Sequence, residues 1–388
     1  MRFPEFSGEW KSHQIKEIAS IVGGGTPDTN VKEYWAGDIN WYTPSEIGKT
    51  KYVNRSIRRI SHFGVDNSSA KILPKGTILL STRATIGEKS ITETECCTNQ
   101  GFQSVIPNVH TDTNFCYYAL DGVKSEMIRR ASGSTFLEIS SSQLSSIHFR
   151  LTDIREQRKI GLFLSLIDER IETQSKIIEE QETLLKSLAD SSIKALCDGQ
   201  CKMVPFSELY ERAGEGGTPS TSERAYYDNG DIPFIKIDDL KSKYITKHQD
   251  NISELGLKNS SAWIIPENSV IYSNGATIGA VSINTCPIST KQGILGVVPI
   301  SMVYTEYLYY LMSSTYFAKE INRIVTEGTM KTAYLKDINN ILCPLPPLDT
   351  QIKIAKELAS LSERLEVEMR ILEQYKLQKV VLLSRMFI

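Results

Sequence analysis

A heptad pattern within residues 151–198 constrains the fold more than any other feature of the sequence. Counting from Ile160 in alternating steps of four and three reaches a series of mostly apolar positions, with charged residues filling the places between them. This pattern predicts one long amphipathic helix with a single apolar seam. At about 1.5 Å per residue the seam is roughly 43 Å long, a length typical of a spacer. The seam positions are Ile160, Leu164, Ile167, Ile171, Gln174, Ile178, Gln181, Leu185 and Leu188.

Residues 347–388 repeat this pattern 194 positions later, and Gln157 matches Gln351 at the start of each segment. Two helices of equal heptad phase, separated by one domain-sized segment, can pair antiparallel within one chain. Matched ends would then place Gln174 opposite Glu368, a polar layer that fixes the register. Two unpaired helices or a homodimeric coiled coil are the alternatives. The second seam is Ile354, Leu358, Leu361, Leu365, Glu368, Leu372, Tyr375, Lys379 and Leu382.

The repeat extends beyond the helices. Residues 72–87, ILPKGTILLSTRATIG, recur as IIPENSVIYSNGATIG at 264–279, Gly25-Thr26-Pro27 recurs at 217–219, and Gln100-Gly101 recurs at 292–293. Short β-branched segments bounded by Gly or Pro predict strands, and aromatic spacing near 112–131 and 303–326 predicts a helix late in each copy. The sequence therefore predicts a tandem duplication of an α+β domain. Its predicted segments are a first domain at 1–150, a central spacer helix at 151–198, a second domain at 199–346 and a C-terminal spacer helix at 347–388.

Composition limits the class of protein. A chain of 388 residues with 40% hydrophobic content can form two or three globular domains. No apolar run approaches the ~20 residues of a membrane span, and the N-terminus has no export signal, so we expect a cytoplasmic protein without membrane contact. The seven scattered cysteines predict reduced thiols, and no histidine lies near Cys197 or Cys201 in sequence, so we expect no metal.

Motifs for catalysis are missing from the sequence. The glycine-rich segments do not predict a phosphate loop. The Walker pattern G-x-x-x-x-G-K-[ST] would end at Gly48-Lys49-Thr50, but Thr43 occupies the position of its first glycine. We interpret the Gly-Thr-Pro segment as a structural turn. The five histidines do not recur between the two copies, which argues against a duplicated catalytic site. We therefore expect a protein that is not an enzyme and that needs no cofactor.

Polar residues cluster at three loop positions of each copy, and these residues differ between copies although the framework is shared. Arg and Lys can bind phosphates, while Arg, Ser and Thr can also donate to base edges. The net charge of −2 means that any nucleic-acid contact must come from such clusters. The candidate DNA-binding residues of the first copy are Lys49, Lys51, Arg55, Arg58, Arg59, Thr82, Arg83, Thr85, Ser134 and Thr135. Those of the second are Lys236, Lys241, Lys243, Ser273, Asn274, Thr277, Thr329 and Lys331.

These motifs, in this order and with a twofold repeat, resemble the DNA-specificity subunit of type I restriction-modification enzymes over the whole chain. The resemblance is carried by FPEFSGEW, GGGTP, INWYTPSEIG, STRATIG and REQRKIGLFLSLIDERIETQSKIIEEQETLLKSL, and by GEGGTPST, SNGATIG and PLPPLDTQIKIAKEL in the second copy. It implies two target-recognition domains that each read one half of a split double-stranded DNA sequence. It also implies that methylation and cleavage belong to partner subunits, with two methylation subunits docking largely on the helices and restriction subunits joining them. The first copy has FRLTDIREQRKI where the second has the Pro-Pro helix entry PLPPLDTQIKI.

A spacer of about 40 Å is close to one turn of B-DNA, ~34–36 Å, so it fits two domains that enter major grooves on one face of the duplex. If Arg83 reads a guanine, Arg83→Ala should weaken binding and relax specificity at one half-site by ~1–3 kcal/mol, whereas an equal loss on all sequences would indicate a phosphate contact. The alternatives are a protein-interaction scaffold with two lobes on a coiled-coil hinge, and an enzyme with an unfamiliar site.

Overall fold

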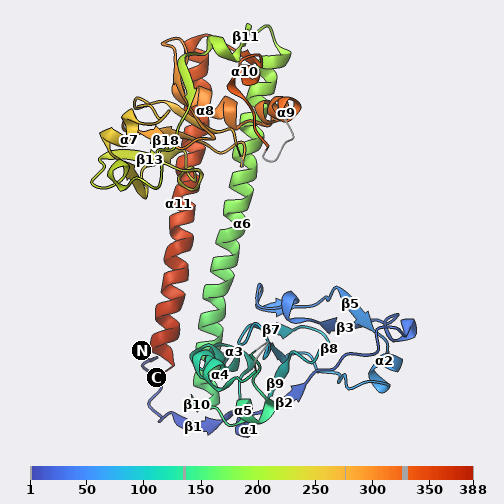
Figure 1. Ribbon diagram of the computed structural model, residues 1–388. Coiled ribbons are helices and arrows are strands. Elements are labelled where there is room, and N and C mark those ends of the chain that lie inside the picture. The colour runs from blue at the N-terminus through green and yellow to red at the C-terminus, as the bar shows by residue number, and fades with distance from the viewer. Residues whose placement is uncertain (1, 134–136, 276, 326–330, 388) are drawn as a thin grey trace. The chain divides into compact units, whose positions relative to one another are not determined.

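The structure, a computed structural model, describes residues 2–133, 137–275, 277–325 and 331–387. It divides into two parts, Met1–Ser175 with Arg370–Ile388 and Lys176–Met369, and each contains one α+β domain and a stretch of both long helices (Figure 1). The long helices are α6 (Ile154–Asp198) and α11 (Leu348–Met386).

The first part is built around two sheets. The larger has five strands in the order β2-β9-β6-β7-β4, and the smaller has the order β5-β3-β8, in which β3 and β8 run parallel. A separate antiparallel pair, β1 with β10, leads into α6. The strands are β1 (Lys11–Gln14), β2 (Ala19–Gly23), β3 (Ile39–Tyr42), β4 (Tyr52–Val53), β5 (Arg58–Ile60), β6 (Ile78–Leu80), β7 (Lys89–Thr92), β8 (Cys96–Thr98), β9 (Gln103–Pro107) and β10 (His148–Leu151).

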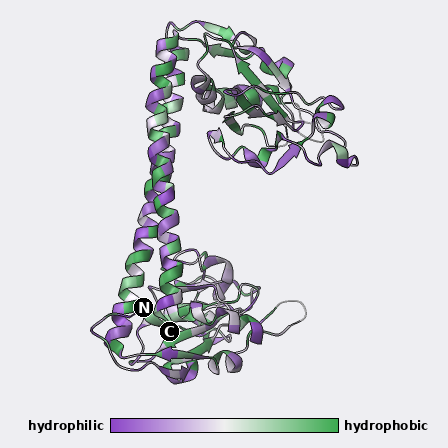
Figure 2. Ribbon diagram, turned by 90° about the vertical axis from the view of Figure 1, so that its left-hand side faces the viewer, coloured by the Kyte–Doolittle hydropathy of each residue, from purple (hydrophilic) through white to green (hydrophobic). Residues whose placement is uncertain are grey.

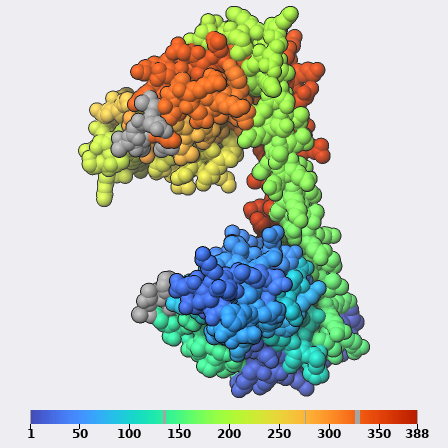
Figure 3. Space-filling view, turned by 90° about the vertical axis from the view of Figure 1, so that its right-hand side faces the viewer, coloured from blue at the N-terminus to red at the C-terminus, as the bar shows by residue number. Residues whose placement is uncertain are grey.

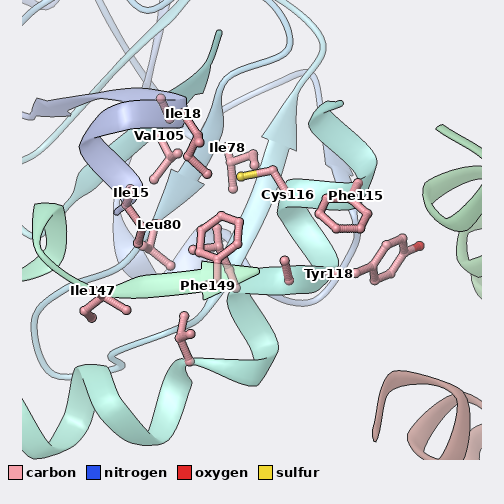
Figure 4. Close-up of a cluster of buried hydrophobic side chains, with 14 of the residues drawn as sticks. Ile15, Ile18, Ile78, Leu80, Val105, Phe115, Cys116, Tyr118, Ile147 and Phe149 are labelled. Atoms are coloured by element: carbon pink, nitrogen blue, oxygen red, sulfur yellow. The ribbon is translucent and has the colours of Figure 1, made fainter. Parts of the chain in front are cut away.

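Helix α3 (Thr113–Gly122) packs against the larger sheet of this part and supplies Phe115 and Tyr118 to the hydrophobic core. Its N-cap is Asp112, whose carboxylate accepts the Phe115 N–H, which satisfies one of the free donors of the first turn. Figure 4 shows Phe115, Cys116 and Tyr118 of this helix beside Ile78 and Leu80 of the sheet. The helices are α1 (Ile15–Ile18), α2 (His62–Asp66), α3 (Thr113–Gly122), α4 (Lys124–Arg130) and α5 (Ser141–Ser145), with short 3-10 turns η1 (Lys32–Tyr34) and η2 (Pro44–Glu46).

The second part repeats this arrangement strand for strand, so the predicted duplication of an α+β domain is confirmed. Its sheets have the orders β12-β19-β16-β17-β14 and β15-β13-β18, with β13 and β18 parallel, and β11 pairs with β20. The strands are β11 (Met203–Pro205), β12 (Tyr210–Glu215), β13 (Ile232–Ile235), β14 (Tyr244–Ile245), β15 (Asp250–Ile252), β16 (Val270–Ser273), β17 (Val281–Asn284), β18 (Ser289–Thr290), β19 (Ile294–Pro299) and β20 (Leu342–Pro344). The short helices are η3 (Phe206–Glu208), η4 (Arg224–Tyr226), η5 (Ile237–Asp239), α7 (Glu254–Lys258), α8 (Thr305–Ser313), α9 (Thr315–Ile324) and α10 (Leu335–Ile338).

A buried glutamine joins each long helix to its own domain. Gln157 accepts the Asp112 N–H at 3.0 Å and donates to the carbonyls of His110 and Thr152. Gln351 makes the same three bonds, accepting the Tyr304 N–H at 2.8 Å and donating to the carbonyls of Met302 and Pro346. The matched pair Gln157 and Gln351 is therefore the polar link between the start of each helix and the loop before α3 or α8.

Both long helices are amphipathic, with hydrophobic and hydrophilic residues alternating along them (Figure 2). They pair within the chain, as predicted. In the first part Ile160, Leu164 and Ile167 of α6 share a hydrophobic cluster with Leu382 and Met386 of α11. In the second part Leu185 and Ala189 lie in one cluster with Ile354, Ala355 and Leu358. The two helices are therefore antiparallel.

The predicted seam needs one correction. In the first part Lys379 forms an ion pair with Asp168 at 2.6 Å between the two helices. Leu188 is 40% exposed, and Ala189 is the buried residue at that level. The predicted layer of Gln174 and Glu368 involves one residue from each part and stays a prediction.

The remaining seam positions differ in how deeply they are buried. Ile160, Leu164, Ile167, Gln174, Ile178, Leu358 and Leu382 are buried. Ile171, Gln181, Leu185, Ile354, Leu361, Leu365, Glu368, Leu372, Tyr375 and Lys379 are half-buried.

The exposure of Leu188 gives a matched pair of substitutions. We expect Leu188→Lys to change the free energy of unfolding by less than about 0.5 kcal/mol, because the side chain already faces water. Ala189→Leu should lower it by about 1–3 kcal/mol, because Tyr310 and Ala355 leave no room for a larger side chain. Urea unfolding followed by helical circular dichroism measures both changes. Equal effects of the two substitutions would contradict this assignment of the buried position.

Candidate nucleic-acid interface

A small pocket lies where three strands of the first part end. The parallel strands β3 and β8 present their carboxyl ends at the same edge, and the chain leaving β6 reaches this edge as well. The pocket has a volume of about 250 Å³. It is lined by Pro44 after β3, Asn99, Gln100 and Gly101 after β8, and Arg83 and Ala84 after β6.

Hydrogen bonds hold the loops of this pocket in place. The Thr82 N–H donates to the Gly101 carbonyl at 2.9 Å, and the Asn99 side chain accepts the Gly101 N–H at 2.9 Å. Gln100 accepts a bond from the Thr26 hydroxyl. A Cβ on Gly24 would lie 1.9 Å from the Asn99 carbonyl oxygen, so only glycine allows the chain to pass so close to the end of β8. The glycine-rich turn is thus a structural support of the pocket.

The second part has a pocket at the same place, with a volume of about 350 Å³. Residue Ile237 follows β13, Lys291 and Gln292 follow β18, and Gly275 follows β16. The Asn274 N–H donates to the Gly293 carbonyl at 3.0 Å, which matches the bond between Thr82 and Gly101. The wall is completed by Glu215, Thr218, Gly293, Thr332 and Tyr334.

An aromatic and basic cluster lies on the small sheet of the first part. The Arg58 guanidinium stacks 3.5 Å from the Trp35 ring centre, and Trp35 meets Trp41 edge to face at 5.0 Å. Stacking on a tryptophan holds an arginine in one orientation while leaving its donors available. Lys49, Arg55 and Arg59 are exposed nearby in sequence. In Figure 3 the segment coloured blue, early in the chain, forms much of the visible surface of this part.

At the corresponding strands, the described residues of the second copy form no such cluster. Lys236 forms an ion pair with Asp250 at 2.6 Å at the corresponding strands, and Lys241 is exposed. The two domains therefore present different charges on the same frame.

Several predicted DNA-binding side chains lie inside the protein, and we correct them here. Thr82, Ser273, Asn274 and Lys243 are buried. The Ser273 hydroxyl donates to the backbone of its own turn, and the Asn274 amide donates to Glu215 at 3.1 Å. These residues support the loops and do not reach a ligand on the surface.

Lys51, which is half-buried, and Lys243, which is buried, occupy equivalent positions beside the helix tyrosines. Lys51 donates to Tyr118 Oη at 3.1 Å and to Ser165 Oγ of α6 at 2.5 Å. Lys243 donates to Tyr310 Oη at 3.4 Å and to the Glu306 carboxylate at 2.9 Å. Both lysines therefore connect an edge strand to helices.

The remaining predicted residues are distributed as follows. Arg83, Thr85, Thr277 and Lys331 are exposed, and Arg83 lies 3.8 Å from the Glu138 carboxylate. Ser134, Thr135 and Thr329 lie outside the described residues. The pocket residues Asn99, Gln100, Lys291, Gln292 and Glu215 were not predicted, although the repeated Gln-Gly pair marked their location.

Burial lowers the pKa of Lys51 from 10.5 to about 8, with Asp168 opposing and Lys379 assisting the shift. Between pH 8 and 10.5 the unfolded chain therefore binds a proton at this lysine that the folded chain has lost, so stability rises with pH across this window. We expect Lys51→Met to remove that rise. Urea midpoints of the variant and the parent at pH 7.5 and 9.5 measure the difference. Parallel pH dependences in the two proteins would contradict this prediction.

The described ranges contain no group of three or more His, Cys, Asp or Glu side chains that could hold a metal ion. None of the helices within these ranges combines the length and apolar character needed to cross a membrane.

Comparison with known proteins gives one consistent result. The family model of the type I restriction modification DNA specificity domain matches residues 7–183 and 200–376. The specificity subunit of the type I restriction enzyme MjaIX from Methanocaldococcus jannaschii is 30% identical over 364 residues, covering 87% of this chain and 83% of the relative. The EcoR124I/EcoR124II specificity subunit from Escherichia coli is 30% identical over 175 residues, which is 43% of each chain.

Solved structures show the same fold at low sequence identity. The S subunit of a type I restriction-modification system from M. genitalium has a TM-score of 0.60 at 19% identity, with 98% of this chain and 96% of that chain covered. A chain from a structure describing complex assembly and conformational transition of the type I system has a TM-score of 0.63 at 15% identity, with 99% and 98% covered.

Proposed function

Because this chain belongs to the family of type I restriction-modification DNA specificity proteins, we propose that it is the sequence-specific DNA-binding subunit of a type I complex. In this function each α+β domain binds one half of a bipartite double-stranded target. The paired helices α6 and α11 set the length of the gap between the two halves.

The observation that carries this proposal is the pair of equivalent pockets at the strand ends. Each domain holds the same Gln-Gly turn against the loop that follows β6 or β16, and each surrounds it with different polar side chains. A DNA-binding protein that recognises two different half-sites needs a common frame and different contact residues. A scaffold that binds one kind of peptide twice has no need for such a difference.

Partner subunits supply the chemistry in this proposal. Two methylation subunits dock largely on the helices, one for each copy of the repeat, and restriction subunits join the complex. The duplication supports this arrangement, since two similar surfaces can bind two identical subunits. The chain itself positions the complex on DNA and performs no catalytic step.

Salt dependence of DNA binding tests the proposal. Six to ten phosphate contacts should reduce the affinity by about 10³–10⁵-fold between 50 and 200 mM salt. Fluorescence anisotropy of labelled duplex DNA, with the full chain and its co-expressed methylation subunits, measures this loss. We expect Arg59→Ala to reduce the salt slope by about one contact, and Lys75→Ala, an exposed lysine at the opposite end of β6, to leave it unchanged. Affinity that does not respond to salt would favour the protein-interaction scaffold instead.

A further inference from the structure

The two pockets are built from matching positions. Gln100 and Gly101 correspond to Gln292 and Gly293, and Pro44 and Ile237 both begin a 3-10 turn after a central strand. In the first part the Thr82 N–H donates to the Gly101 carbonyl after β8. In the second part the Asn274 N–H donates to the Gly293 carbonyl after β18. The frame of the pocket is therefore common to both domains.

The wall residues of the two pockets differ in chemistry. Arg83 in the first pocket corresponds to Gly275 in the second, and Asn99 corresponds to Lys291. The pocket is about 250 Å³ where the arginine stands and about 350 Å³ where the glycine replaces it. The two pockets therefore share one backbone framework but differ in hydrogen-bond donors, charge and volume. Such a difference is expected at a position that selects its ligand.

The side chains match particular base edges. Arginine donates two hydrogen bonds to guanine O6 and N7, and an asparagine amide pairs with adenine N6 and N7. Arg83 and Asn99 together therefore fit the major-groove edge of a purine. Lysine also donates to guanine, and a carboxylate accepts from cytosine N4. Lys291 and Glu215, which line the second pocket, fit a G·C pair.

Glu215 is held in place for such a contact. Its Oε1 atom accepts the Gly293 N–H at 3.2 Å and the Asn274 amide at 3.1 Å. The buried Asn274 side chain thus positions Glu215 instead of contacting DNA itself. The first part has Gly23 at the position of Glu215, so its pocket lacks this carboxylate.

We propose that each pocket reads a base pair of its own half-site, and that Arg83 with Asn99 in the first domain, and Lys291 with Glu215 in the second, determine which base pair is accepted. This inference rests on the proposed function. It adds the residues that set the specificity and the class of base that each pocket takes.

The test exchanges the wall residues between the domains. The parent complex and the Arg83→Gly/Asn99→Lys variant, each as full chain with co-expressed methylation subunits, are offered a duplex library with both half-sites randomised. We expect the variant to lose its purine preference at the first half-site by about tenfold to a hundredfold. The second half-site and the gap should stay as in the parent.

A second variant guards against misfolding of the first, because Asn99 also accepts the Gly101 N–H. Lys291 is exposed, so Lys291→Asn should fold normally and change the preference at the second half-site alone. Lys75→Ala is the matched control and should leave both half-sites unchanged. Unchanged bases at both half-sites in folded variants, or an equal loss of affinity for all sequences, would overturn the inference while leaving the proposed function intact. A parent complex that selects no sequence would overturn both.

Discussion

Replacing Gln157 by leucine should lower the free energy of unfolding of the first part by about 3 kcal/mol. The leucine removes three hydrogen bonds and leaves the Asp112 N–H and the Thr152 carbonyl without their partner. A buried polar group without a partner costs about 1–3 kcal/mol. Tryptophan fluorescence during urea unfolding mainly follows this part, because Trp10, Trp35 and Trp41 lie in it and Trp263 alone lies in the second part.

The neighbouring residue and the second copy provide controls for this experiment. Arg158 is exposed, so Arg158→Leu should leave the unfolding midpoint nearly unchanged. Gln351→Leu should destabilise the second part by a similar amount, because its three bonds match those of Gln157. A wild-type midpoint for Gln157→Leu would show that the glutamine is not the link between helix and domain.

Inserting seven residues at matched points of α6 and α11 should lengthen the unread gap of the DNA target without changing the half-site bases. Seven residues add two turns and about 10.5 Å while nearly preserving the phase of the seam. At ~3.4 Å per base pair this length corresponds to about three base pairs. Affinity for the original target should fall by about a hundredfold or more, because the two domains can no longer bind both half-sites together.

The same insertion in α6 alone is the control, because it lengthens one helix of the pair and not the other. Electrophoretic mobility shifts on targets with gaps of increasing length measure the outcome. We expect the matched insertion to move the optimum to a longer gap, and the single insertion to weaken binding at every gap. Altered half-site bases at an unchanged gap would contradict the role proposed for the helices.

The sequence predicted the duplication and the two long helices because both are written as repeated patterns. It placed Leu188 in the seam because a strict heptad was counted throughout. An α-helix drifts by ~20° per heptad relative to that repeat, so over about four repeats the buried position moved by one residue to Ala189.

The positions of Lys51 and Lys243 could not be recognised from local sequence. Lys51 follows a run of polar residues and was interpreted as a surface residue, whereas its partners Tyr118 and Ser165 lie far along the chain. The available signal was the tyrosine pair that recurs with it, since Tyr117-Tyr118 and Tyr309-Tyr310 keep the same spacing from Lys51 and Lys243. A lysine that lies at the same distance in sequence from the tyrosine pair in both copies is part of the structural framework that the two domains share.

The pocket residues could not be recognised from the sequence either. Asn99 and Lys291 differ between the two copies, and neither lies within a cluster of charged residues. Only the parallel pairing of β3 with β8, and of β13 with β18, places them beside the loops that follow β6 and β16. Strand direction within a sheet is set by the tertiary fold, and local sequence does not specify it.

Selection from a duplex library in which two randomised blocks are separated by spacers of several lengths tests the central claim most directly. With the full chain and its methylation subunits, we predict that two different short sequences are enriched, and at one spacer length only. Enrichment of a single block, or equal enrichment at every spacer length, would contradict the account of one chain that holds two different DNA-reading domains at a fixed separation.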